Sequence, residues 1–167
     1  IKARDGSKYG QTKKRNAKAI EEKESQRWLE SFKATQGAAA VLSEKTRVIS
    51  IADRESDIYE LLALAKEEGN RVGLLIRAQH NRGVVHEEKR LWGFLRSLPE
   101  AAKAAAAIPA KDGQKQRTAI LSIRFSEVTL NAPLLKDKQA PIKVWAVEAR
   151  EENAPSGAAA VCWRLSA

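Results

Sequence analysis

Three carboxylates close to one another follow a short apolar run, and side chains of this type can hold a metal ion or transfer protons. Asp53 comes first, and Glu55 and Asp57 follow it at alternate positions. The run before them, residues 48–52, reads Val-Ile-Ser-Ile-Ala. Such a run is typical of a strand buried on both faces, as in the centre of a parallel sheet. Asp53 therefore lies where this strand ends.

A helix is predicted to follow, because apolar side chains recur at i, i+3, i+4 and i+7 from residue 58, namely Ile58, Leu61, Leu62 and Ala65. We expect Ser56 or Asp57 to cap its first turn. Asp53 then lies between a parallel strand and its crossover helix, at the sheet edge where ligands and catalytic groups collect. The alternative is that Asp53 only caps the next helix.

A second strand is predicted at 71–77, after a helix stop at Gly69-Asn70. Strand, helix and strand at this spacing indicate a βαβ unit with parallel strands. Arg77 then leaves the sheet at the same edge as Asp53. Together with His80 and Arg82 it predicts a strip that contacts DNA phosphates. An ordinary solvated loop is the alternative, and the two histidines give little support for a zinc site.

Two more helices and a β-rich half complete the prediction. A helix is expected over 21–36, ending at Gly37, with Trp28 in the core, and a short one runs from residue 91 to Pro99. Period-two patterns then predict an antiparallel meander, with strands at 119–125, 128–132, 142–147 and 159–165. Asp112-Gly113 and Ser156-Gly157 are turn signals, and Trp145 is assigned to the core.

The composition favours a nucleic-acid partner. The chain has 167 residues and a net charge of +9, with a pI near 9.8. This balance favours a polyanion, nucleic acid before anionic membrane, although it could merely aid solubility. The chain contains no run of about 18 apolar residues, the length that a membrane-spanning helix needs. The single cysteine, Cys162, fits a reducing cytoplasm as a small buried side chain. Because the chain contains no methionine, we expect either a processed product or a fragment of a longer chain.

Basic side chains are concentrated in residues 1–18, which carry seven of them against one acid. Glycines and scattered polar residues give this segment no apolar face, so it is predicted to be an exposed loop. Lys13, Lys14 and Arg15 are its candidate phosphate contacts, since each neutralised phosphate releases counterions. A disordered linker is the competing interpretation.

The chain resembles the IS4-type insertion-sequence transposases, the group that includes the Tn5 transposase. The resemblance rests first on Asp-Arg-Glu-Ser-Asp-Ile at 53–58, which is similar to the second-aspartate motif of that family. It also takes in Glu-Lys-Glu-Ser at 22–25 with Arg-Trp-Leu at 27–29, Leu-Ile-Arg-Ala at 75–78 with His80, and Ile-Lys-Val-Trp-Ala-Val at 142–147. These pieces occur in the family's order over nearly the whole chain.

The resemblance implies an α/β fold with a partial ribonuclease-H-like core, residues 20–100, after a basic loop at 1–19. An inserted antiparallel β-sheet segment at 101–167 would lie over the DNA end. Asp53 would be one of three carboxylates that hold Mg²⁺ or Mn²⁺ in the complete enzyme, which works as a homodimer on paired transposon ends. We expect this chain alone not to hold the metal tightly.

Trp163 matches the family's tryptophan just after the inserted sheet, in Val-Cys-Trp-Arg-Leu at 161–165. That resemblance implies stacking on a base flipped out near the cleavage point. An aromatic face stacks on bases with little sequence preference, with a contribution of roughly 1–3 kcal/mol per base. A tryptophan that packs within the sheet is the alternative.

Two of the family's three carboxylates have no counterpart in the chain. The family's catalytic Glu lies in Tyr-x2-Arg-x3-Glu-x6-Lys, in which Arg comes three residues after Tyr. At that distance from Tyr9 the chain has Thr12, and at that distance from Tyr59 it has Leu62. Asp5 follows no apolar strand, so it does not match the first catalytic Asp. We therefore expect the central part of a cut-and-paste DNA transposase of the DDE type, inactive by itself.

Two other functions remain open from the sequence. The first is a non-catalytic DNA-binding module on a ribonuclease-H-like scaffold. The second is a phosphohydrolase with a nucleophilic Asp at a strand end. A phosphohydrolase of this kind would require a second Asp two residues after Asp53, where the chain has Glu55.

Overall fold

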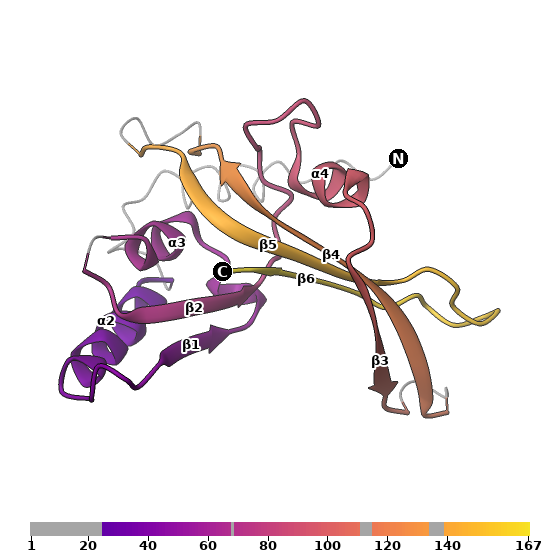
Figure 1. Ribbon diagram of the computed structural model, residues 1–167, viewed down its shortest axis with the longest axis horizontal. Coiled ribbons are helices and arrows are strands. Elements are labelled where there is room, and N and C mark those ends of the chain that lie inside the picture. Colours follow the sequence, from indigo (N-terminus) through magenta and orange to yellow (C-terminus); the bar gives the residue numbers. More distant parts are fainter. Residues whose placement is uncertain (1–24, 68, 111–114, 134–138) are drawn as a thin grey trace, which may run out of the picture.

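The computed structural model describes residues 25–67, 69–110, 115–133 and 139–167. They form one curled mixed sheet with helices (Figure 1). In chain order the elements are α2 (Gln26–Ala40), β1 (Val48–Ala52), the 3₁₀ turn η2 (Arg54–Ser56), α3 (Tyr59–Ala65), β2 (Val72–Arg77), α4 (Leu91–Ser97), β3 (Ala102–Ile108), β4 (Arg117–Leu130), β5 (Ile142–Glu151) and β6 (Cys162–Ser166). The fold is therefore mixed α/β. The basic loop predicted at 1–19 lies outside the described residues.

The predicted βαβ unit and the predicted meander are both confirmed, and they share one sheet. β1 and β2 pair in parallel on either side of α3. The four later strands pair antiparallel, β3 with β4, β4 with β5 and β5 with β6. β6 then pairs antiparallel with β2, which gives the strand order β1-β2-β6-β5-β4-β3. The sheet is therefore continuous across residue 100, where the sequence predicted a boundary.

The prediction that the 48–52 strand is central and buried on both faces is wrong. β1 lies at one edge of the sheet, where β2 is its only partner among the described residues. Ile51 is 74% exposed, and Ile49 is also exposed. A five-residue apolar run shows that a strand can be buried, but it carries no information about what pairs with its second edge.

The predicted end of the first helix at Gly37 is also wrong, because α2 continues to Ala40. Gly37 has open space around it, and the alanines that follow favour helix more than any other residue type. Ala39 is buried under this extra turn. Trp28, by contrast, packs against the core as predicted.

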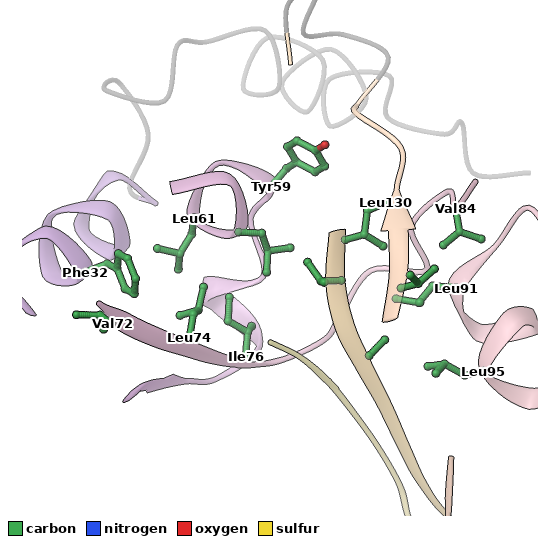
Figure 2. Packing of buried hydrophobic residues seen from close by; sticks show 14 of the residues in the cluster. Phe32, Tyr59, Leu61, Val72, Leu74, Ile76, Val84, Leu91, Leu95 and Leu130 are labelled. Carbon is green, nitrogen blue, oxygen red and sulfur yellow. The ribbon is translucent and has the colours of Figure 1, made fainter. Parts of the chain in front are cut away.

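One apolar core runs along the helix-covered face of the sheet (Figure 2). At one end, Phe32 of α2 and Leu61 of α3 lie over β2. At the other end, Leu91 and Leu95 of α4 lie near Leu130 of β4. Trp92 of α4 is partly buried against the same cluster.

The strands of the β-rich half differ from those predicted: β4 and β5 are longer, β6 is shorter, and β3 was not among them. Residues 117–130 form a single strand, where two strands at 119–125 and 128–132 were expected. Ser126 and Glu127 interrupt the apolar alternation, but their backbones still pair with β5, so the ladder continues through them. Gly157 takes a left-handed φ of 78°, as its turn signal predicted. The other turn signal, at 112–113, lies outside the described residues. Among the helices of the described residues, none has the length and apolar character needed to cross a membrane.

Candidate functional site

Asp53 lies at the carboxyl end of β1, as the sequence predicted, and its side chain is exposed. Its Oδ1 accepts a hydrogen bond from the backbone N–H of Glu55 at 3.0 Å, so it caps the 3₁₀ turn η2. Its carbonyl oxygen accepts from the hydroxyl of Ser56 at 2.6 Å. Asp53 therefore acts as a cap through one carboxylate oxygen, but of the turn η2 and not of the predicted helix. No hydrogen bond or ion pair within the described ranges occupies the other carboxylate oxygen.

The prediction that Ser56 or Asp57 caps the following helix is wrong. The residue before α3 is Ile58, and no side chain caps that helix. Asp57 is instead 2% exposed, and its carboxylate faces the segment after β2. Spacing along the chain cannot distinguish a cap from a buried carboxylate, because the partners of Asp57 lie more than 20 residues away.

Arg77 leaves β2 at the same edge of the sheet as Asp53. Ala52 and Ile76 are register partners in the parallel pair, so Asp53 and Arg77 are the next residues on adjacent strands. Ile76 is fully buried under the helices, and alternation along the strand then directs Arg77 to the opposite face. This confirms the prediction that Asp53 and Arg77 leave the sheet next to each other.

Within the described residues, the helices lie on the face opposite Arg77. We call the Arg77 face the open face, because it is exposed around β1 and the middle of β4 and β5, although Ala119, Leu121 and Glu151 on the same face are buried. Arg77 pairs with Leu165 of β6, Leu165 with Val147 of β5, and Val147 with Phe125 of β4. Paired residues in a sheet share a face. The large apolar side chains exposed on this open face are Ile49, Ile51, Phe125, Trp145 and Trp163.

Trp163 belongs to this same open face. It precedes Leu165 by two residues on β6, so the two side chains point the same way. Its side chain is 38% exposed, intermediate between a packed core residue and a fully solvated one. The register therefore brings Arg77 and Trp163 onto one face of adjacent strands, and Asp53 follows the end of β1 beside Arg77.

The remaining residues of the predicted strip differ in their exposure and in their bonding partners. His80 is exposed, and its backbone N–H donates to Asp57 Oδ2 at 2.8 Å. Arg82 is only 13% exposed, and its Nη2 lies 2.5 Å from Asp57 Oδ1. Its guanidinium thus already bonds inside the protein, and its contact with DNA stays a prediction. Lys13, Lys14 and Arg15 lie outside the described residues.

The described carboxylates near β1 do not by themselves make a metal site. Glu55 forms an ion pair with Arg27 at 2.6 Å, and both oxygens of Asp57 accept hydrogen bonds. Asp53 is then left with one unoccupied oxygen, whereas two-metal chemistry needs several. Within the described ranges, no three His, Cys, Asp or Glu side chains group as metal ligands.

One prediction about a side chain of the β-rich half is corrected by the structure. Trp145 was assigned to the core, but it is half exposed, and its ring lies 6.2 Å from that of Phe125 on the open face. Two basic side chains of this half form ion pairs, Arg117 with Glu151 and Arg124 with Glu152. Alternation predicted two faces for each strand but not which face the helices cover.

A buried cluster on the helix-covered side was not predicted at all. Glu148 of β5 is fully buried, and its Oε2 accepts from the Arg164 Nε at 2.6 Å. The Arg164 guanidinium in turn lies 4.5 Å from the centre of the Trp92 ring. The Cys162 thiol lies 3.8 Å from the same Oε2, and burial raises its pKa, so the thiolate is disfavoured.

Comparison with models of known protein families and with curated proteins gave no match. The functional interpretation therefore rests on the residues and their geometry.

Proposed function

We propose that this chain is the central part of a cut-and-paste DNA transposase of the DDE type. In this proposal, residues 20–100 are part of a ribonuclease-H-like core and residues 101–167 are the inserted β-sheet segment. Metal-dependent strand cleavage and strand transfer belong to the complete enzyme. The chain by itself binds DNA and does not cut it.

The observation that supports this proposal most is that Arg77 and Trp163 share one face of the sheet, with Asp53 next to Arg77 at the end of the neighbouring strand. Strands lie about 4.8 Å apart and rise about 3.3 Å per residue, so the Cα atoms of Asp53 and Trp163 are about 12 Å apart. That span matches about two nucleotides of an extended strand. A cation, an aromatic face and a carboxylate are thus available together to one DNA end.

Each of these side chains has a different task in the proposed complex. Arg77 contacts a phosphate, because a guanidinium binds phosphate oxygens with paired hydrogen bonds. Trp163 offers a stacking surface to an unpaired base. Asp53 lies beside Arg77, so a phosphate between them would also face its negative charge. In the complete enzyme, Asp53 and two further carboxylates would hold the divalent metal that activates the attacking oxygen.

The alternative is a non-catalytic DNA-binding module on the same scaffold. It is favoured by the bonds of Glu55 and Asp57, because Arg27 engages one oxygen of Glu55 and both oxygens of Asp57 accept hydrogen bonds. The open reading frame on both sides distinguishes the two. An upstream strand that ends in Asp, with a downstream Tyr-x2-Arg-x3-Glu-x6-Lys, supports the enzyme, and their absence supports the module.

Fluorescence anisotropy with a labelled DNA duplex tests the proposed binding. We expect binding at low salt that weakens steeply between 50 and 200 mM salt, as counterion release requires. Arg77→Ala should weaken binding and lower the slope of log K against log salt by about one. Arg96→Ala, an exposed arginine on α4, is the control and should change neither. Absence of binding at low salt would refute the proposal.

A plasmid-nicking assay tests the statement that the chain alone does not cut DNA. Supercoiled plasmid is incubated with the purified chain and Mg²⁺ or Mn²⁺, and the expected result is no relaxation. Nicking that Asp53→Ala abolishes would show that the chain carries a complete catalytic centre.

A further inference from the structure

Asp57 is the most extensively bonded carboxylate near the proposed site. Its Oδ2 accepts from the backbone N–H groups of Gln79 and His80 at 2.7 and 2.8 Å. Its Oδ1 accepts from the Arg82 Nη2 at 2.5 Å, and its carbonyl oxygen accepts from the same nitrogen at 2.7 Å. A carboxylate that is 2% exposed is stable only with such donors, since burial of an unpaired charge is costly.

These bonds join the two chain segments that carry the proposed site residues. On one side, Asp57 ends the turn that Asp53 begins, and its own N–H donates to the Arg54 carbonyl at 3.2 Å. On the other side, only Ala78 separates Arg77 from the first amide that Asp57 holds. The Asp57 side chain therefore connects the exits of β1 and β2 beyond the last register pair of the two strands.

Arg82 extends this connection to the helix-covered side of the sheet. Its guanidinium lies 6.0 Å from the centre of the Tyr59 ring on α3. Its carbonyl oxygen accepts from the N–H of Leu91, the first residue of α4, at 2.9 Å. The side chain of Arg82 therefore points away from the open face and neutralises Asp57.

We propose that Asp57 is a positioning residue, which fixes Arg77 and the segment 79–82 relative to Asp53. It does so through Arg82 and the two backbone amides, without contact to DNA or metal. The proposal rests on the proposed function where it concerns DNA. Its structural part concerns bonds that form whether or not DNA binds.

A double-mutant cycle in the full chain tests the positioning role. DNA affinity is measured by anisotropy for the unmodified chain, Asp57→Asn, Arg77→Ala and the double variant, at a temperature where circular dichroism shows each to be folded. We expect Asp57→Asn to weaken binding at least fivefold. The effect of Arg77→Ala should fall at least threefold in the Asp57→Asn background, because a misplaced Arg77 has less affinity to lose. Unchanged affinity for Asp57→Asn, or strictly additive effects, would overturn the proposal.

Glu151→Gln is the matched control. Glu151 is also a buried carboxylate paired with an arginine, Arg117, but it lies at the far end of β5. Both substitutions break a buried pair, so both lower stability to urea. Only Asp57→Asn should change DNA affinity and its coupling to Arg77. An equal loss of affinity in both variants would show that Asp57 acts only through general stability.

Amide hydrogen exchange keeps the structural part testable if Asp57→Asn does not fold or the chain does not bind DNA. In the unmodified chain, the amides of Gln79 and His80 should exchange as slowly as those within β2. Arg82→Lys, which keeps the charge and loses the guanidinium geometry, should speed their exchange at least tenfold, with β4 unchanged. Fast exchange of both amides in the unmodified chain would overturn the positioning role. Slow exchange of both amides in a chain that does not bind DNA would refute the proposed function but not the positioning role.

Discussion

Asp53 and Arg77 are the first residues beyond the register pair Ala52–Ile76 of two parallel strands. They therefore leave the sheet side by side at one edge. Two consequences follow from this arrangement: opposite charges lie next to each other, and the Arg77 side chain points to the face that the described helices leave uncovered. A DNA end that reached Arg77 would also be close to Asp53 and Trp163.

Trp163→Ala should weaken binding of a duplex with an unpaired terminal nucleotide by about 5- to 150-fold, because stacking contributes about 1–3 kcal/mol per base. The measurement is anisotropy with that duplex and with a fully paired one, whose affinity should change less. Trp145→Ala is the control, since its half-exposed ring contacts Phe125 on the same face. Equal losses for the two tryptophans would show that the face binds bases without a defined stacking site.

Asp53→Asn should leave the free energy of unfolding within about 0.5 kcal/mol of the unmodified chain, because an amide oxygen can still accept from the N–H of Glu55. Asp53→Ala removes that acceptor and should cost about 1 kcal/mol. Urea unfolding measures both. Asp53→Asn should also tighten DNA binding in the presence of a chelator, because a negative charge beside Arg77 is lost. Weaker binding would contradict this electrostatic account.

We expect the free energy of unfolding to fall in acid, in part because Glu151 becomes protonated. Hydrogen bonds from Arg117 hold the pKa of the Glu151 carboxyl below its usual range, and the backbone N–H of Val161 adds to this. A carboxyl with a lowered folded pKa binds fewer protons folded than unfolded. Its stabilisation is complete above the unfolded pKa and is lost as the pH falls through the folded one.

Urea unfolding of the unmodified chain and Glu151→Gln from pH 7 to pH 3 measures this effect. The variant should be less stable at pH 7, and the difference should shrink as the pH falls. Glu152→Gln, which changes a more exposed partner of Arg124, is the control and should show a smaller difference at pH 7. A difference that stays constant with pH would exclude the Arg117–Glu151 pair as its source.

Ile51→Lys should reduce self-association of the purified chain. β1 is an edge strand with exposed apolar side chains, and its residues include no charge or proline that would prevent pairing with another strand. Sedimentation equilibrium should show an association constant at least tenfold lower in the variant. Ile120→Lys is the control, because Ile120 is similarly exposed on a strand paired on both sides. Equal effects would mean that association does not use the β1 edge.

Local patterns predicted much of the secondary structure. The apolar run before Asp53 forms a strand, the i, i+3, i+4 pattern after it forms α3, and the next run forms a parallel strand. The predictions failed where a local signal had a distant competitor. Gly37 did not end α2, because nothing near it opposes helix, and the assignment of Asp57 as a cap failed because its donors come from beyond β2.

The sequence by itself determined where β1 and β2 end, and hence that Asp53 and Arg77 leave neighbouring strands at one edge. Its alternation also determined which side chains of a strand lie together. Only the tertiary structure decided that β1 lies at the edge of the sheet, that the helices cover the Ile76 face and that Trp145 and Trp163 lie on the other. The physical reason is that periodicity reports the spacing of apolar side chains along one segment. Pairing and burial depend on which distant segments supply the hydrogen bonds and the apolar surface.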